Sequence, residues 1–159
     1  MLKKSAFYLM AILFVFSGQF LVSSGLVTGT PPTIDRLMLD GKAPMSSIAR
    51  GPGIIYIWAE WCGVCRTMQG NVDAVLRDYP GVTIAVRSDD RHQLADYLRS
   101  HQLNWPVVDD SDGRIGERFG IRGVPALFFL NRQGNIVFTS VGYTSELGLR
   151  FRLWLTQFF

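Results

Sequence analysis

The chain has 159 residues, of which 48% are hydrophobic, 13% aromatic and 18% charged, so it can bury a sizeable core and is neither disordered nor collagen-like. Its two cysteines are too few for a disulfide-dense scaffold or a four-cysteine zinc site. The formal net charge of +3 includes Lys3 and Lys4 at the N-terminus, and the remainder carries no basic excess of the kind that indicates nucleic-acid binding.

Residues 1–24 form a separate apolar segment. Lys3 and Lys4 precede a run without charge, Ser5–Ile34, whose densest apolar part is Ala6–Phe16. A basic start followed by an apolar core is typical of a segment that the secretion machinery reads. We expect a retained signal anchor, because Ala6–Ser24 is close to the roughly 20 residues that a membrane-spanning helix needs. A cleaved signal peptide is the alternative, and either outcome places the rest of the chain outside the cytoplasm.

Residues 25–32 (GLVTGTPP) are predicted to be a linker, because Gly, Thr and Pro replace a regular apolar pattern. Residues 33–159 then read as one folded domain without internal repeats. The apolar run Ile54–Ala59 predicts a central strand that is buried on both faces. An amphipathic helix follows and ends at Pro80. Its apolar side is expected to hold residues at helical spacing, namely Met68, Val72, Val75, Leu76 and Tyr79.

Strands and helices continue to alternate after this helix. Val82–Val86 predicts a strand, and Asp89 or Asp90 can cap the next helix. The inward face of that helix is expected to consist of Leu94, Leu98 and His101. Trp105–Val108 predicts a short strand, and a short helix is expected to open at Asp112-Gly113 and to run to Phe119.

The C-terminal part is predicted to be a hairpin and a helix. Pro125–Leu130 and Ile136–Val141 flank a turn-rich connection, which is typical of two paired strands. The last helix is expected from Ser145, with an apolar stripe of Leu147, Phe151, Trp154, Leu155 and Phe158. Together these elements predict an α/β domain with a mixed central sheet and helices on both faces.

Cys62 and Cys65 form a C-x-x-C pair directly after the predicted central strand. Cys62 would lie at a helix N-terminus, where free backbone N–H groups and the helix dipole favour a thiolate. Such positions lower the pKa of a cysteine from about 8.5 to around 7 or below. Cys65, one turn later, is expected to be buried and to attack a mixed disulfide on Cys62, which closes the Cys62–Cys65 bond.

Two other uses of the cysteine pair are possible. A purely structural disulfide would stabilise little, because the loop that it closes is so short. Two sulfurs alone are too few for zinc, so no metal site or cofactor is expected. Two thiolates suit Cu(I), and a copper-binding module stays open as an alternative.

A second motif, Gly123-Val124-Pro125, precedes the first strand of the predicted hairpin. Peptide bonds before proline are the ones that adopt the cis form, and we expect a cis bond between Val124 and Pro125. If this loop packs beside the cysteine pair, it would present backbone groups to an extended substrate segment.

The stretch Trp58–Cys65, followed by Gly123-Val124-Pro125, resembles the thioredoxin superfamily. Two further features, the N-terminal anchor and the long segment between Cys65 and Pro125, resemble the exported TlpA-like branch of this superfamily, which carries a strand–helix insertion. Within that branch, the chain resembles membrane-tethered proteins that suppress copper sensitivity. The resemblance implies a thioredoxin fold preceded by one transmembrane helix, and thiol–disulfide exchange in the periplasm from the bacterial inner membrane. It also implies protein disulfides or dithiols as substrates, electrons from a transmembrane relay, and a monomer. A soluble periplasmic protein is the alternative if the signal is cleaved.

The resemblance also assigns roles to single residues. It implies that Cys62 is the nucleophile, Cys65 the resolving cysteine, Pro125 the cis-proline and Trp61 a shield beside the sulfurs. Substrate contacts are expected from the residues next to the two motifs, namely Trp61, Gly63, Val64, Val124 and Pro125.

Two departures from the family pattern bear on the chemistry. Tyr56 stands where thioredoxins carry a buried aspartate, so the usual proton acceptor for Cys65 is missing. Val64 stands where a proline is common, which leaves the redox potential open. We favour a reductase, with a disulfide-forming oxidant as the alternative.

Overall fold

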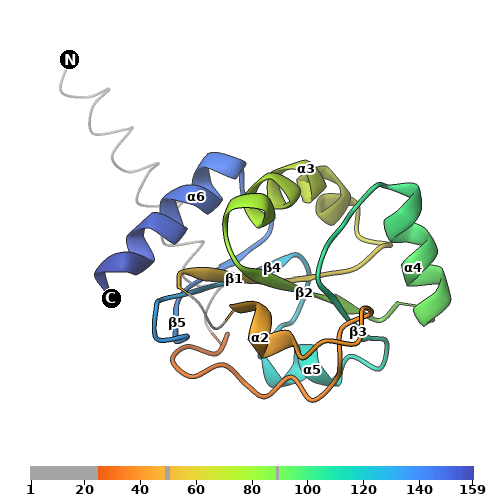
Figure 1. Cartoon of the computed structure of the whole chain (residues 1–159), viewed down its shortest axis with the longest axis horizontal. Coiled ribbons are helices and arrows are strands. Elements are labelled where there is room, and N and C mark those ends of the chain that lie inside the picture. Colours follow the sequence, from red (N-terminus) through yellow and green to blue (C-terminus); the bar gives the residue numbers. More distant parts are fainter. Residues whose placement is uncertain (1–24, 49–50, 89) are drawn as a thin grey trace, which may run out of the picture.

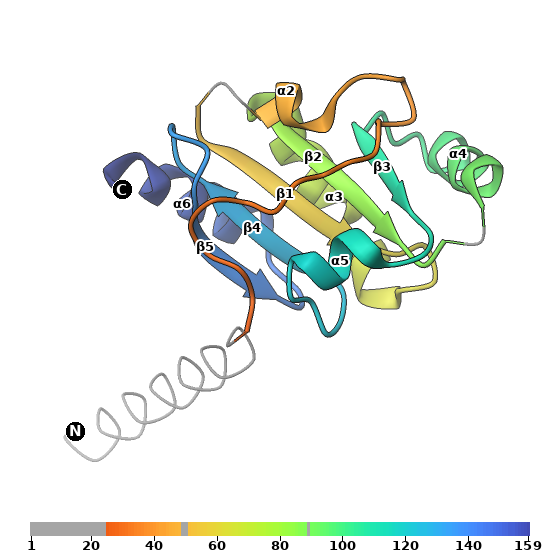
Figure 2. The ribbon, with the colours of Figure 1, turned by 90° about the horizontal axis from the view of Figure 1, so that it is seen from below.

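The architecture follows from three central strands whose residues are all buried. The computed structural model describes residues 25–48, 51–88 and 90–159. Figures 1 and 2 show a central sheet with α3, α4 and α6 on one face and α2 and α5 on the other. The helices are α2 (Pro44–Ile48), α3 (Gly63–Asp78), α4 (Arg91–Ser100), α5 (Arg114–Arg118) and α6 (Glu146–Leu155), and a 3-10 turn, η1, covers Thr156–Phe158. The predicted mixed sheet with helices on both faces is confirmed.

The sheet has the strand order β3-β2-β1-β4-β5. Its strands are β1 (Gly53–Trp58), β2 (Gly81–Val86), β3 (Val107–Asp110), β4 (Ala126–Leu130) and β5 (Ile136–Val141). β1 pairs in parallel with β2, and β2 with β3, whereas β4 is antiparallel to both β1 and β5. Every residue of β1, β2 and β4 is buried, because helices cover both faces of these central strands.

The strand predicted at Trp105–Val108 lies two residues later, at β3. Trp105 packs edge-to-face against Trp58 in the core, and strand pairing starts only where Thr83 faces Val107. β3 then continues into two acidic residues. This is possible because the buried Asp110 carboxylate accepts the backbone N–H groups of Ile115 and Gly116 at 3.0 and 2.8 Å, at the start of α5.

The residues of α4 that face the core match the prediction in part. Leu94 and Leu98 are buried, and the Asp90 side chain caps the helix by accepting the N–H groups of His92 and Gln93. His101, which was expected to face inward, is exposed and stacks on Tyr97 with ring centroids 4.0 Å apart. The other predicted cap, Asp89, lies outside the described residues.

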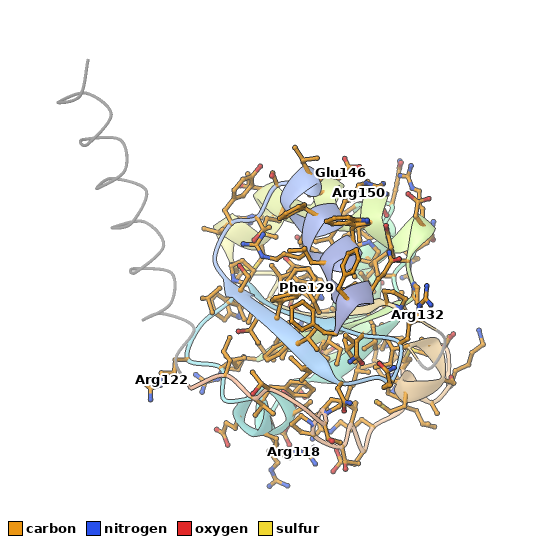
Figure 3. All side chains as sticks on the ribbon, turned by 90° about the vertical axis from the view of Figure 1, so that its left-hand side faces the viewer. Arg118, Arg122, Phe129, Arg132, Glu146 and Arg150 are labelled. Atoms are coloured by element: carbon orange, nitrogen blue, oxygen red, sulfur yellow. A yellow bond between two sulfur atoms is a disulfide. The ribbon has the colours of Figure 1, made fainter. Side chains whose placement is uncertain are left out.

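The apolar stripe predicted for α6 is wrong as a core face. Leu147, Phe151, Trp154 and Phe158 are exposed by 79%, 54%, 49% and 68%, and Leu155 is half-buried. The helix, which lies over the sheet in Figure 3, instead buries Leu149 and Leu153. The helix therefore has two apolar stripes, and the aromatic rings of the outer one contact each other, with centroids 5.9 Å apart for Phe151–Trp154 and 5.0 Å for Trp154–Phe158.

The chain before β1 crosses the face of the sheet that α3 leaves open (Figure 2). Gly29 forms an antiparallel bridge with Ile136 of β5, and Met38 forms one with Val108 of β3, so the segment reaches both outer strands. Residues 25–32, expected as a linker, thus contact the domain. The predicted anchor, residues 1–24, lies outside the described residues. Among the helices of the described ranges, none is long and apolar enough to span a bilayer.

The orientation of α6 can be tested by two substitutions on the same helix. Leu153→Ala is expected to lower the free energy of unfolding by about 2–5 kcal/mol, because it leaves a cavity under a fully buried side chain. Leu147→Ala, on the exposed stripe, is expected to change it by less than about 0.5 kcal/mol. Urea unfolding of both variants measures the difference. The opposite order would show that the predicted stripe, and not the observed one, faces the core.

Candidate active site

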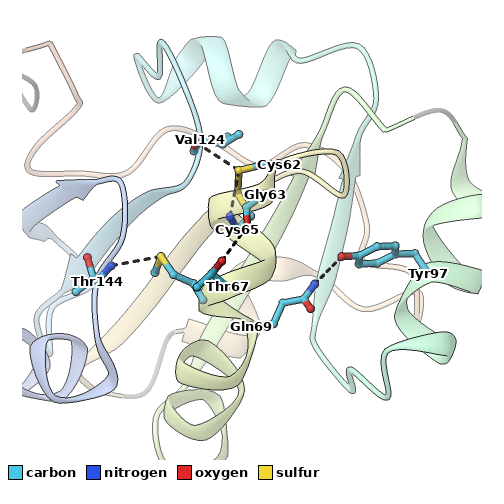
Figure 4. Close-up of a disulfide and its surroundings, with 9 residues drawn as sticks. Cys62, Gly63, Cys65, Thr67, Gln69, Tyr97, Val124 and Thr144 are labelled. Atoms are coloured by element: carbon cyan, nitrogen blue, oxygen red, sulfur yellow. Dashed lines mark hydrogen bonds between the residues drawn. A yellow bond between two sulfur atoms is a disulfide. The ribbon is translucent and has the colours of Figure 1, made fainter.

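Cys62 and Cys65 are joined in a disulfide at the junction between β1 and α3 (Figure 4). After β1 a tight turn, closed by the Cys62 N–H on the Ala59 carbonyl at 3.2 Å, brings the chain into the helix. Cys62 is the N-cap residue of α3, and its sulfur accepts the Cys65 N–H at 3.1 Å. Cys62 is 7% exposed, whereas Cys65 is fully buried. The outer sulfur is thus the one that a substrate can reach.

The N-terminal end of α3 favours negative charge on Cys62. The helix is 16 residues long and has no acidic residue in its first turn. Its free backbone N–H groups and its dipole therefore act on the cap position without a competing carboxylate. Because the Cys65 N–H already points at the Cys62 sulfur, reduction would leave a hydrogen-bond donor in place for a thiolate.

The Gly123-Val124-Pro125 loop meets the disulfide in space. The Val124–Pro125 peptide bond is cis, as the sequence predicts, and the Val124 carbonyl oxygen lies 3.6 Å from the Cys62 sulfur. The Pro125 carbonyl accepts the Gly142 N–H at 2.9 Å, which ties the loop to the end of β5. Two motifs that lie far apart in the sequence are thus held together by the pairing of β4 with its neighbours.

Trp61 borders the disulfide and is 59% exposed. Its indole N–H donates to the Arg87 carbonyl at 3.2 Å, which anchors the ring to the loop after β2. Gly63 and Val64, between the cysteines, are also exposed. The structure therefore gathers all the predicted site residues around one sulfur pair, and their individual roles remain predictions.

A groove of about 320 Å³ lies beside the disulfide, between Trp61 and Val124. Arg87, Glu117 and Arg122 also line it, and sequence reasoning missed them. Parallel pairing of β1 with β2 contained a signal for Arg87, because residues that follow neighbouring parallel strands lie at the same edge of the sheet. Arg122 is two residues before Val124, and its proximity follows from that of the loop.

The core next to α3 is aromatic. Tyr56 is fully buried, its ring packs edge-to-face on Trp105 at 5.9 Å, and its hydroxyl has no hydrogen-bond partner among the described residues. Burial raises the pKa of Tyr56, so the phenol stays protonated at neutral pH and cannot act as a base. Trp105 is 7% exposed and donates to Asp73 at 3.2 Å, which makes it a core residue and not part of the groove.

Contacts with two neighbouring elements hold α3 in place (Figure 4). The Met68 sulfur accepts the Thr144 N–H at 3.4 Å, and Gln69 donates to the Tyr97 hydroxyl at 2.7 Å. These contacts fix α3 against the loop before α6 and against α4. Within the described part of the chain, no group of three or more His, Cys, Asp and Glu residues is placed to hold a metal ion.

Comparison with known proteins places this geometry in a family. The model of the AhpC/TSA family matches residues 34–139. A "thioredoxin-like protein" of Haemophilus influenzae is 31% identical over 109 residues, which cover 68% of this chain but only 65% of that protein. The "thiol:disulfide interchange protein DsbE" of Pseudomonas fluorescens biotype C is 27% identical over 153 residues, covering 89% of this chain and 84% of that one.

The fold recurs in solved structures. A secreted disulfide oxidoreductase of Mycobacterium tuberculosis, described as homologous to E. coli DsbE, aligns with a TM-score of 0.63 at 24% identity. The alignment covers 76% of this chain and 93% of that one, and at this identity it shows the thioredoxin fold alone. Because the family model spans most of the domain, the chain belongs to the AhpC/TSA family of thioredoxin-like proteins.

Proposed function

We propose that this chain is a thiol–disulfide oxidoreductase in which Cys62 and Cys65 exchange a disulfide with protein substrates. The observation that carries the proposal is the position of the Cys62 sulfur, which lies between the Cys65 N–H at 3.1 Å and the Val124 carbonyl at 3.6 Å. At this position the helix N-terminus favours a thiolate on Cys62, and the neighbouring residues Trp61 and Val124 line a groove that a substrate can enter. The name of the DsbE relative supports the same chemistry.

In the reducing direction the exchange has two steps. The Cys62 thiolate attacks one sulfur of a substrate disulfide, forms a mixed disulfide and releases the other sulfur as a thiolate, which takes the Cys65 proton. The Cys65 thiolate then attacks the Cys62 sulfur, closes the Cys62–Cys65 bond and releases the second substrate sulfur, which takes a proton from water. Two electrons pass to the substrate, and a donor dithiol must reduce the enzyme again. The oxidising direction is the reverse.

We also propose a cellular location for the domain and a source of its electrons. The charge-free run after Lys3 and Lys4 supports a single-pass anchor in the inner membrane with the domain in the periplasm. A domain held near the bilayer is suited to receive electrons from a transmembrane relay, which favours a reductase. The alternative is a soluble periplasmic protein or a disulfide-forming oxidant.

A link to copper tolerance enters the proposal through the sequence resemblance alone. Once reduced, Cys62 and Cys65 would offer two thiolates, a ligand set that suits Cu(I). A copper-binding module would retain one Cu(I) per chain against a competing chelator and would show no disulfide exchange. This separates the alternative from the oxidoreductase.

The two cysteines are expected to contribute differently to the exchange. Cys62→Ser should abolish insulin reduction in the presence of dithiothreitol, because it removes the attacking sulfur. Cys65→Ser should also stop turnover, and when the reduced variant is mixed with substrate without dithiothreitol it should accumulate a mixed disulfide, visible on a non-reducing gel. The double variant, which can form no such adduct, is the control. Wild-type activity in either single variant would contradict the proposal.

The direction of electron flow is tested by the reduction potential of the pair. Equilibration of the full chain with glutathione buffers, followed by thiol labelling and mass spectrometry, measures it. A reductase should have a potential of about −200 mV or below. A value near about −120 mV would instead identify an oxidant.

The anchor is tested by the mass and the location of the protein in cells. A retained anchor should leave a chain of 17.9 kDa in the membrane fraction after an alkaline wash. The double variant Leu13→Asp/Val15→Asp should be lost from the membrane fraction, because charges within the apolar run oppose membrane insertion. A shorter chain in the soluble periplasmic fraction would show that the signal is cleaved.

A further inference from the structure

The groove beside the disulfide carries an uneven distribution of charge. Arg87 and Arg122 line it and are exposed, and Glu117 is the one carboxylate among its described lining residues. Neither arginine forms an ion pair with a described carboxylate. The groove therefore presents two available guanidinium groups against one carboxylate.

Other arginines close to α5 are paired, which sets these two apart. Arg36 contacts Asp112 at 2.5 Å, and Arg114 contacts the same carboxylate at 3.4 Å. Arg118 contacts Asp35 at 2.6 Å. Because these carboxylates are already engaged, Arg87 and Arg122 keep their positive charge open within the groove. Arg66, next to Cys65 in α3, is also exposed and without an ion pair among the described residues, but it does not line the groove.

The two arginines lie in the groove close to the two residues that flank the reactive sulfur. The Arg87 carbonyl accepts the Trp61 indole N–H at 3.2 Å, so the Arg87 backbone is attached to Trp61. Arg122 lies two residues before Val124, whose carbonyl is 3.6 Å from the Cys62 sulfur. Gly113 has no side chain to obstruct Arg87, whose Nε would lie 3.4 Å from a Cβ at that position. A peptide that extends from Cys62 into the groove would therefore meet two cations.

We propose that this groove selects protein substrates that carry an Asp or Glu close in sequence to the reacting cysteine, since Trp61 and Val124, which flank the Cys62 sulfur, line the same groove as the two arginines. The inference rests on the proposed thiol–disulfide exchange and names the substrate class of that site. Guanidinium groups bind carboxylates through paired hydrogen bonds. Because exposed ion pairs add little affinity, the main effect is on the rate of productive encounter, and salt screens it.

The experiment compares three peptides of equal length that react with the reduced full chain in non-ionic detergent. Each peptide carries one cysteine in a mixed disulfide with 2-mercaptoethanol, flanked two residues away on both sides by Glu, Gln or Lys. Rates are normalised to the reaction with 4,4′-dithiodipyridine, a small neutral disulfide, so that changes in Cys62 reactivity cancel. The Glu peptide is expected to react about tenfold faster than the Lys peptide at low salt, and the difference should disappear near 1 M salt.

Variants assign the effect to the groove. The double variant Arg87→Glu/Arg122→Glu should reverse the order of the peptides, and Glu117→Gln should increase the preference for Glu. Arg132→Glu is the matched control: Arg132 is exposed, forms no ion pair with a described residue and lies at the end of the hairpin remote from Arg122 (Figure 3). It should leave the order unchanged.

Three results would overturn the inference. Equal normalised rates for the three peptides would show that the groove does not select charge. A shift by Arg132→Glu half as large as that of the double variant, which replaces two arginines, would show that net charge, and not the groove, acts. If the reduced protein reacts with neither the peptides nor the neutral disulfide, the proposed exchange itself fails, a result distinct from the first two.

Discussion

The site depends on one constraint: the Cys62 sulfur is held between the start of a helix and the loop before β4. The helix contributes the Cys65 N–H at 3.1 Å, and the loop contributes the Val124 carbonyl at 3.6 Å. Burial of β1 on both faces determines where α3 begins, and the antiparallel pairing of β1 with β4 brings the loop alongside. The groove, the exposed Trp61 and the buried Cys65 all follow from this junction.

The core next to the helix limits which groups can take part in proton transfer. Tyr56, whose phenol stays protonated, packs against Trp105 in this core. Such an environment disfavours charge on a buried sulfur. Cys65 is therefore suited to act as a neutral thiol that loses its proton only when the mixed disulfide offers a departing thiolate to receive it.

The sequence predicted the parts in which local pattern and tertiary environment agree. A continuous apolar run identified β1, and the C-x-x-C after it identified the start of α3. The sequence did not predict which side of α6 faces the core, because apolar side chains lie on both sides of this helix. Leu153 and Trp154 both lie on apolar stripes, but only Leu153 is buried. The predicted strand Trp105–Val108 also ended before Asp110, the last residue of β3. A hydropathy pattern does not show the backbone N–H groups that bind this buried carboxylate. The groove arginines come from separate loops, and only the folded chain brings them together.

The segment before β1 has a consequence for a protein that is proposed to bind other polypeptides covalently. Unpaired strands at the margins of a sheet are templates on which another polypeptide can add as an extra strand and begin to aggregate. Gly29 occupies part of one margin at Ile136, and Met38 occupies part of the other at Val108. A substrate that is covalently attached at Cys62 thus finds fewer free backbone groups on which to add as an extra strand.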